Sequence, residues 1–415
     1  MCLCLPPKRM AALRQVVPMK NKPTLSISSY YGGKGRMAHF IADRLNYDCE
    51  VFVTPFGGMC RELLNKPRHH VECYNDYSSG LCALMTVLSD RDKADVFIHR
   101  LYEETDFSEE MFLKHKAVYD SAEGDLEEQE REKLRQLLIA DKVIGNHYPR
   151  AKLEEILLKS FDVMTDMQAA EKEKETEFNR TLYHWVNLYK VKQQQGFLPR
   201  PADMGVEISE MDLAIATYVT FKMSRDGMGK TFSKEKFKTT DQYHAQVLNL
   251  YECAERLEGV NIFQLDAMDF FRHWRPDGDM SHTPYFDEWL NDPNVMMYCD
   301  PSYISPDSEQ KLLEGINIDK EDCLSDAIQK MYDGRKWPKN LGEIYARSFG
   351  YVDQERFLQC IQNAKCSMMV SNYDLALYNK YLNERTGWRR EEFITTTSVG
   401  GKMDNSRTEV IWYNY

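Results

Sequence analysis

The sequence predicts an α/β fold, with a parallel sheet in one domain that the chain interrupts with a mostly helical insertion. Short apolar runs broken by glycine-rich turns fill residues 27–90, and runs of the same kind return from about residue 258. Between them, residues 91–257 are rich in Glu, Lys, Arg and Leu, which favour helices. Strand-like runs that alternate with helix-favouring sequence are typical of parallel sheets.

The expected strands follow in chain order and share apolar or β-branched composition. They are Glu50–Val53, Val71–Tyr74, Asn261–Leu265, Val295–Cys299, Ser367–Val370, Phe393–Ser398 and Thr408–Tyr413. The last two predict a hairpin around Gly400-Gly401. In the insertion, Asp125–Lys142 predicts a helix with an apolar stripe (Leu134, Leu137, Leu138, Val143). We therefore expect a tail at 1–26, a domain of 27–90 plus 258–415, and an inserted domain at 91–257.

Composition narrows the class of protein. The charge sum is 53 − 65 = −12, which disfavours indiscriminate nucleic-acid binding but leaves room for a local basic face. The 11 cysteines form no CxxC pair, which predicts reduced thiols, no zinc site and a cytoplasmic location. No apolar stretch approaches the roughly 20 residues of a membrane span, and residues 1–22 lack the apolar core of a signal peptide.

The most informative segment is Asp300-Pro301-Ser302-Tyr303, which follows the apolar run Val295–Cys299. Ligands of open α/β sheets bind at the carboxyl ends of the strands. The Asp300 carboxylate and the Pro301 carbonyl are two acceptors, and Tyr303 is a flat ring for stacking. This combination suits the exocyclic amino group of a nucleobase.

Two glycine turns precede it in the chain. Tyr31-Gly32-Gly33-Lys34 combines close backbone approach with a cation for a carboxylate or phosphate. Pro55-Phe56-Gly57-Gly58 lies between a strand and the helix expected at Arg61, where doubly wound folds receive nucleotides. About 20 residues later Asp76-Tyr77 ends the next strand, the expected place for a ribose-binding acid.

Two further segments have alternative interpretations. In Phe221–Lys238 the cations Arg225, Lys230 and Lys234 lie among aromatic residues, which suits phosphate contact but also an ordinary solvated loop. Gly229-Lys230-Thr231 would fit a P-loop ATPase with Asp300 as magnesium ligand, except that the pattern needs glycine at Ser224. His69-His70 predicts a surface turn, and Ser371-Asn372 ends another strand.

Taken in order, these motifs resemble those of the Dam-like, DPPY-type adenine-specific DNA methyltransferases. The first glycine turn is similar to that family's opening motif, the second to its PFxG loop, and Asp300–Tyr303 to its DPPY. Asp76, Asp269 and Ser371-Asn372 also stand at matching places. The resemblance covers roughly 27–90 and 215–415.

The resemblance implies a Rossmann-like class I methyltransferase fold with an inserted target-recognition domain, and transfer of a methyl group from S-adenosylmethionine to the N6 of a flipped adenine in double-stranded DNA. It assigns catalysis to Asp300, Pro301 and Tyr303. For substrate binding we expect Asn372 and, from the basic loop described above, Arg225, Lys230 and Lys234. The cofactor-binding residues would be Tyr31, Gly32, Gly33, Lys34, Pro55, Phe56, Gly57, Gly58, Asp76, Tyr77 and Asp269. No metal is expected. A DNA-associated protein of a prokaryote or phage is implied, for which a cognate restriction endonuclease is a conceivable partner.

Three residues depart from the family pattern. Ser302 replaces the second proline and should loosen the turn, Thr54 replaces an acid, and Cys60 stands where glycine is common. They motivate a rival hypothesis, a binding module for cofactor and DNA with impaired catalysis. Methylation of adenine in RNA is a third hypothesis. Because a small hydroxylated side chain need not disturb the Pro301 carbonyl, activity remains the expectation.

Overall fold

The computed structural model describes most of the chain and divides it into two compact units. The described residues are 24–30, 32–35, 37–123, 134–135, 137–145, 147–149, 153, 182, 208–265, 267, 286–332, 349–396 and 406–415. The sheet unit comprises Met1–Asp76, Leu88–Arg91 and Leu248–Tyr415, and the helical unit comprises Tyr77–Val87 and Asp92–Val247.

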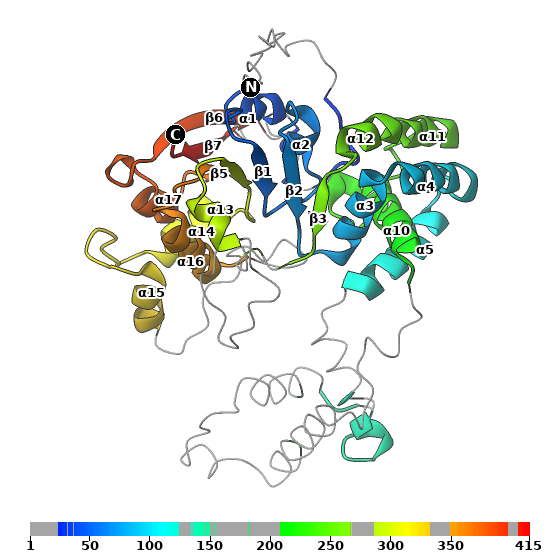
Figure 1. Ribbon diagram of the computed structural model, residues 1–415. Coiled ribbons are helices and arrows are strands. Elements are labelled where there is room, and N and C mark those ends of the chain that lie inside the picture. Colours follow the sequence, from blue (N-terminus) through cyan, green and yellow to red (C-terminus); the bar gives the residue numbers. More distant parts are fainter. Residues whose placement is uncertain are drawn as a thin grey trace, which may run out of the picture. The chain divides into compact units, whose positions relative to one another are not determined.

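The sheet unit contains a seven-stranded mixed sheet in the order β3-β2-β1-β4-β5-β7-β6 (Figure 1). Its strands are β1 (Val51–Thr54), β2 (Val71–Asn75), β3 (Asn261–Phe263), β4 (Val295–Cys299), β5 (Ser367–Tyr373), β6 (Arg389–Thr396) and β7 (Ser406–Tyr413). The first five are parallel, and β7 is antiparallel to both β5 and β6. The predicted α/β class and all the predicted strands are confirmed.

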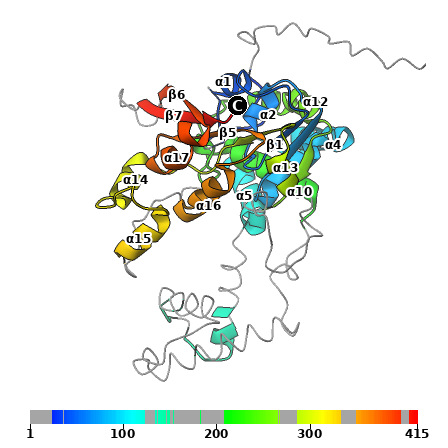
Figure 2. The same ribbon diagram turned by 60° about the vertical axis from the view of Figure 1, so that its left-hand side comes forward.

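The C-terminal hairpin forms one edge of the sheet (Figure 2). Strand β6 begins at Arg389, four residues before the predicted Phe393. The added residues are Arg389-Arg390-Glu391-Glu392, whose charges read as a loop in the sequence. On an edge strand such charges are acceptable, because they face solvent and oppose pairing with other chains.

Helices of the sheet unit cover the strands. Because successive side chains of a strand point to opposite faces of the sheet, neighbouring residues pack against different helices. They are α1 (Ala38–Ala42), α2 (Arg61–Asn65), α12 (Leu250–Leu257), α13 (Phe286–Asn291), α14 (Pro306–Leu312), α15 (Leu324–Tyr332), α16 (Tyr351–Ile361) and α17 (Ala376–Tyr381). Val53, Met297, Cys299, Val370 and Trp412 lie in one buried core with apolar residues of α13 to α17. Helix α12, expected in the insertion, belongs to the sheet unit.

The helical unit is described by α3 (Ser79–Ser89), α4 (Arg91–Glu104), α5 (Glu109–Glu123), α10 (Glu210–Met223), the 3₁₀ turn Arg225–Gly227 and α11 (Thr240–Leu248). Helix α10 is buried from Ala214 to Met223 and contacts α5. Of the predicted apolar stripe, Leu134 and Leu138 are buried, and Leu137 and Val143 pack against them. Within the described ranges, no helix is long and apolar enough to cross a membrane.

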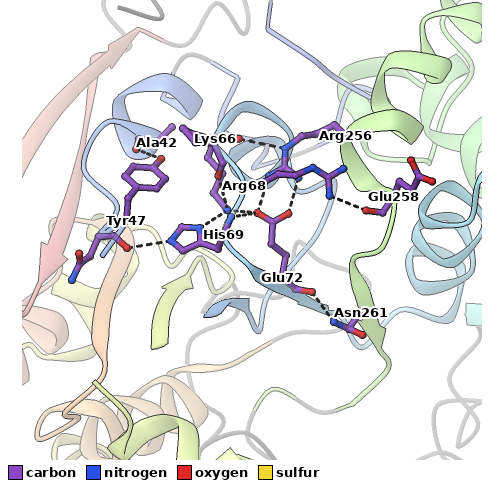
Figure 3. A network of polar contacts seen from close by, with 11 residues as sticks. Ala42, Tyr47, Lys66, Arg68, His69, Glu72, Arg256, Glu258 and Asn261 are labelled. Atoms are coloured by element: carbon purple, nitrogen blue, oxygen red, sulfur yellow. Dashed lines mark hydrogen bonds and ion pairs between the residues drawn. The ribbon is translucent and has the colours of Figure 1, made fainter. Parts of the chain in front are cut away.

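A buried ionic cluster lies around Glu72 on β2 (Figure 3). The Glu72 carboxylate accepts hydrogen bonds from the Lys66 ammonium and, at 2.7 and 2.9 Å, from the Arg256 guanidinium. His69 joins it: its Nδ1 lies 2.8 Å from Lys66 Nζ and its Nε2 3.1 Å from the Asn46 carbonyl. His69 is only 7% exposed, so the prediction that it lies in a surface turn is wrong. The neighbouring charges explain its burial, because polar groups leave water where partners compensate them.

Candidate functional site

Two of the predicted site segments, Pro55–Gly58 and Asp300, lie where the strand order reverses. Strands β2 and β3 follow β1 on one side of the sheet, and β4 and β5 follow on its other side. Strands β1 and β4 are neighbours, with Val53 paired to Met297. Pro55–Gly58 follows β1 and Asp300 follows β4, so both begin at the carboxyl ends flanking this reversal. In open α/β sheets, a ligand-binding crevice forms at this place.

Asp300 is bonded to the first glycine turn. Its Oδ1 lies 2.8 Å from Lys34 Nζ, and the same ammonium donates to the Gly32 carbonyl at 3.0 Å. The Lys34 side chain is 5% exposed and that of Asp300 18%. The turn requires a φ of 81° at Gly32, a conformation that glycine adopts without strain. The opening turn and the predicted catalytic carboxylate are thus in direct contact, although the sequence had assigned Lys34 to the cofactor alone.

Tyr303 lies beside this ion pair. Lys34 Nζ is 4.1 Å from the centroid of its ring, within the range of a cation–π interaction. The Tyr303 hydroxyl donates to Glu409 Oε2 at 3.3 Å, and Tyr373 packs against its ring at 4.7 Å in an edge-on geometry. Burial, and then the charge of Asp300, raise the pKa of the Tyr303 hydroxyl well above its usual value. The ring is therefore a fixed, neutral platform.

The turn at Ser302 is more firmly held than its sequence predicts. The Ser302 hydroxyl donates to the Phe349 carbonyl at 3.0 Å. Gln354 Nε2 donates to the Ser302 carbonyl at 2.8 Å and to that of Phe349 at 2.9 Å. The expected loosening is wrong, because these three hydrogen bonds fix the turn. The Phe349 ring also contacts Phe56 at 5.0 Å, which links this turn to the second glycine loop.

The second glycine loop is tied to the end of β2. The Gly58 amide donates to Asp76 Oδ2 at 2.8 Å, and the Gly57 amide donates to the Asn75 carbonyl at 2.8 Å. A Cβ on Gly57 would lie 2.0 Å from the Tyr74 ring, so only glycine fits there. The loop that ends β1 and the acid that ends β2 therefore form one unit, as the nucleotide hypothesis requires. Pro55 is buried and Phe56 half-buried in this loop.

Three consecutive residues at the start of α2 border the site, and two of them, Arg61 and Glu62, were not predicted from the sequence. Cys60 has φ 40° and ψ 42°, the left-handed region that favours glycine. Arg61 Nε is buried with no hydrogen-bond partner among the described residues, and its guanidinium borders Gly35 so closely that a Cβ there would lie 2.0 Å from it. Glu62 is buried, and burial followed by the charge of Asp300 raises its pKa to about 8. The signal available in the sequence was a single glutamate, Glu62, in a largely apolar segment.

Not every predicted residue joins this site. Asn372 is fully buried: its Nδ2 donates to the Tyr378 hydroxyl at 3.0 Å, and its Oδ1 accepts from the Tyr373 amide. Its side chain stabilises the end of β5, which corrects its assignment to substrate binding. Pro301 is buried next to Asp300. Tyr31 and Asp269 lie outside the described residues.

The remaining predicted residues belong to the helical unit. Tyr77 is 45% exposed, and Arg225, Lys230 and Lys234 are exposed, with Lys234 Nζ 3.6 Å from Glu109. The segment that carries Arg225, Lys230 and Lys234 follows helix α10, and a β-bridge pairs Ser224 with Phe232 in it. A P-loop follows a strand and opens a helix, so the ATPase alternative lacks the structural context it needs. Among the described residues no cluster of His, Cys, Asp or Glu could hold a metal ion.

A scan against models of known protein families and a search of curated protein sequences both find no match. The chemistry of the site therefore has to be inferred from its own residues.

Proposed function

We propose that this protein is a DNA methyltransferase that moves a methyl group from S-adenosylmethionine to the N6 of adenine. One observation carries the proposal: Asp300 lies at the reversal of strand order, bonded to the Lys34 turn, in the unit that also contains the Gly57–Asp76 loop. A carboxylate and an aromatic ring at this edge suit a planar amine. The same edge offers glycine turns for a nucleotide-like cofactor.

The described residues fit this cofactor. Its amino-acid end carries a carboxylate, and the glycine turn is bordered by two cations, Lys34 and Arg61. Arg61 Nε is a buried donor with no partner among the described residues, as expected of a group that awaits an anion. Its ribose hydroxyls suit the Asp76 carboxylate, which the Gly58 amide holds in place. Lys34, Arg61 and Asp76 are the residues that would hold it.

Asp300 would do the chemical work of the chain. The adenine N6 is a weak nucleophile because its lone pair is delocalised into the ring. A hydrogen bond from this amine to Asp300, and a second to the Pro301 carbonyl, would favour a pyramidal nitrogen and stabilise its developing positive charge. When bound, the cofactor would supply an electrophilic methyl group on a sulfonium sulfur, which would keep the electron pair of the S–C bond. As its bond to the methyl carbon forms, the nitrogen would lose one proton, and we propose that the Asp300 carboxylate would accept it.

The test is methyl transfer by the purified chain from tritiated S-adenosylmethionine to unmethylated genomic DNA, followed by long-read sequencing. We expect label in DNA at adenine within a fixed sequence context. Asp300→Ala should abolish transfer, while calorimetry should still show binding of the cofactor. Equal transfer by Asp300→Ala would refute the assignment.

Two rivals give different results in the same assay. A catalytically impaired binding module would bind cofactor and DNA in calorimetry and leave no label. The Ser302 hydrogen bonds argue against it, because they fix the turn whose looseness motivated that hypothesis. An RNA methyltransferase would be identified by competition, with unlabelled RNA, but not DNA, suppressing the incorporation of label.

A further inference from the structure

We propose that Ser371, backed by Tyr298, is a positioning residue that fixes the Asp300 carboxylate so that its Oδ2 receives the amine of the substrate. The inference rests on the proposed function and assigns a task to each oxygen of Asp300. It begins from a hydrogen bond that no motif predicted: Ser371 Oγ donates to Asp300 Oδ1 at 2.8 Å.

Strand register brings these side chains together. In the parallel pairing of β4 and β5, Tyr298 lies opposite Met369 and Cys299 opposite Val370. Side chains alternate between the two faces of a sheet, so Tyr298, Asp300 and Ser371 share one face. Cys299 and Val370 point to the opposite face, into the core with α13 to α17. Asp300 follows the last residue of β4, and Ser371 lies within β5 one residue after Val370, so the two side chains meet beside the carboxyl end of β4.

The direction of the hydrogen bonds follows from the proton count. A carboxylate paired with an ammonium can only accept a hydrogen bond, so the Ser371 hydroxyl donates its one proton to Asp300. The Tyr298 hydroxyl, 2.9 Å from Ser371 Oγ, must then donate to it. Burial, and then the charge of Asp300, raise the pKa of Tyr298 well above its usual value, so this donor stays protonated. Both Tyr298 and Ser371 are fully buried, so the packing around them holds this series of hydrogen bonds in place.

The two oxygens of Asp300 thereby differ. Oδ1 accepts from Ser371 at 2.8 Å and pairs with Lys34 at 2.8 Å. No described residue is hydrogen-bonded to Oδ2, and the Asp300 side chain keeps 18% of its surface exposed. Two donors from opposite elements, a strand and a glycine turn, prevent rotation of the carboxylate. The remaining oxygen is presented to an amine without a search among orientations, which lowers the entropic barrier to reaction.

The test compares three variants in single-turnover methyl transfer with saturating tritiated S-adenosylmethionine and unmethylated genomic DNA. Ser371→Ala should lower the transfer rate about 10- to 100-fold, since misplacement of a reacting group costs up to about that factor. Ser371→Thr, which keeps the hydroxyl, should restore most of the rate. Tyr298→Phe should show a smaller loss. Cofactor affinity, measured by calorimetry, should change little in all three.

The matched control is Ser367→Ala. Ser367 is a buried serine at the other end of the same strand, where its Oγ accepts from Asn46 Nδ2 at 2.9 Å. Ser367→Ala removes a serine hydroxyl and its hydrogen bond from the same strand, away from Asp300, so the transfer rate should not change. Equal losses in Ser367→Ala and Ser371→Ala would mean that a general weakening of β5 is responsible, which overturns the proposal.

A second measurement does not depend on activity. Crystal structures of the wild type and Ser371→Ala should show the carboxylate of Asp300 turned about its Cβ–Cγ bond in the variant, with Ser371→Thr as the wild type. An unchanged carboxylate in Ser371→Ala would refute the positioning role. Absence of methyl transfer by the wild-type protein would instead refute the proposed function, and the crystallographic comparison would still decide the role of Ser371.

Discussion

The burial of His69 predicts that acid weakens the sheet unit through this one side chain. Nδ1 faces the Lys66 ammonium at 2.8 Å, so the folded protein keeps His69 neutral with its proton on Nε2, donated to Asn46. Burial, followed by the charge of Lys66, lowers the pKa of His69 from 6.5 to about 4. In the unfolded chain the ring takes up a proton near pH 6.5, whereas the folded protein resists until about pH 4.

The sign and size of the effect follow from proton linkage. Between these two pKa values the unfolded chain binds more protons, so the free energy of unfolding falls as the pH falls. The shift of about 2.5 units, at about 1.4 kcal/mol per unit, corresponds to a full loss of about 3 kcal/mol, of which about 2 kcal/mol is lost between pH 7 and pH 5. Glu72, whose pKa its Arg256 and Lys66 partners lower, adds a further loss at lower pH.

The assay is hydrogen exchange of the β2 amides, measured by mass spectrometry at pH 7 and pH 5. A local probe is needed because a chain of two units need not unfold in one step. His69→Gln should lose about 2 kcal/mol less protection than the wild type over this interval. His70→Gln is the control, because His70 is the exposed neighbour, and it should behave as the wild type. The same pH dependence in His69→Gln and wild type would refute the reasoning.

The carboxylates of Glu72 and Glu62 give two further predictions, which hydrogen exchange can also check. Glu72→Gln should destabilise the sheet unit by about 3–5 kcal/mol at pH 7, because it leaves Lys66 and Arg256 facing a neutral amide in a buried site. A loss below about 1 kcal/mol would show that water solvates the cluster. Glu62 has its pKa raised from 4.5 to about 8, so the folded protein binds the extra proton and stability falls as pH rises between these values. Glu62→Gln should remove about 2 kcal/mol of the loss between pH 6 and pH 8, and an unchanged slope would contradict the burial of a neutral acid here.

Local patterns carried most of the fold. Each predicted strand exists, because apolar runs of four to eight residues bounded by turns are formed by short-range preferences. The strands differ from the prediction in extent: β3 ends at Phe263, β5 continues to Tyr373, and β6 begins at Arg389, so that it includes the charged residues Arg389–Glu392. These charged residues belong to a strand because they pair with β7, and their own sequence does not show that pairing. Likewise, Asp300 was placed at a strand end from its preceding residues alone.

Register decided what the site contains. From the sequence, Ser371 and Asn372 were equally placed at a strand end, and Asn372 was chosen. Successive residues of a strand point to opposite faces, so only one of the two can face Asp300. The pairing of β5 with β4 gives that place to Ser371 and directs Asn372 toward Tyr378. Nothing in the tetrapeptide itself distinguishes the two.

By itself, then, the sequence determined the strands, the two glycine turns and the acid after β4, because these depend on neighbours a few residues away. Only the tertiary structure decided which partner each polar group takes. Arg256 reaches Glu72 across 184 residues, and the buried His69 contacts the Asn46 carbonyl across 23 residues. Lys34 reaches Asp300 in the same way. Contacts of this range depend on how distant elements pack, and the period of a sequence pattern carries no record of that.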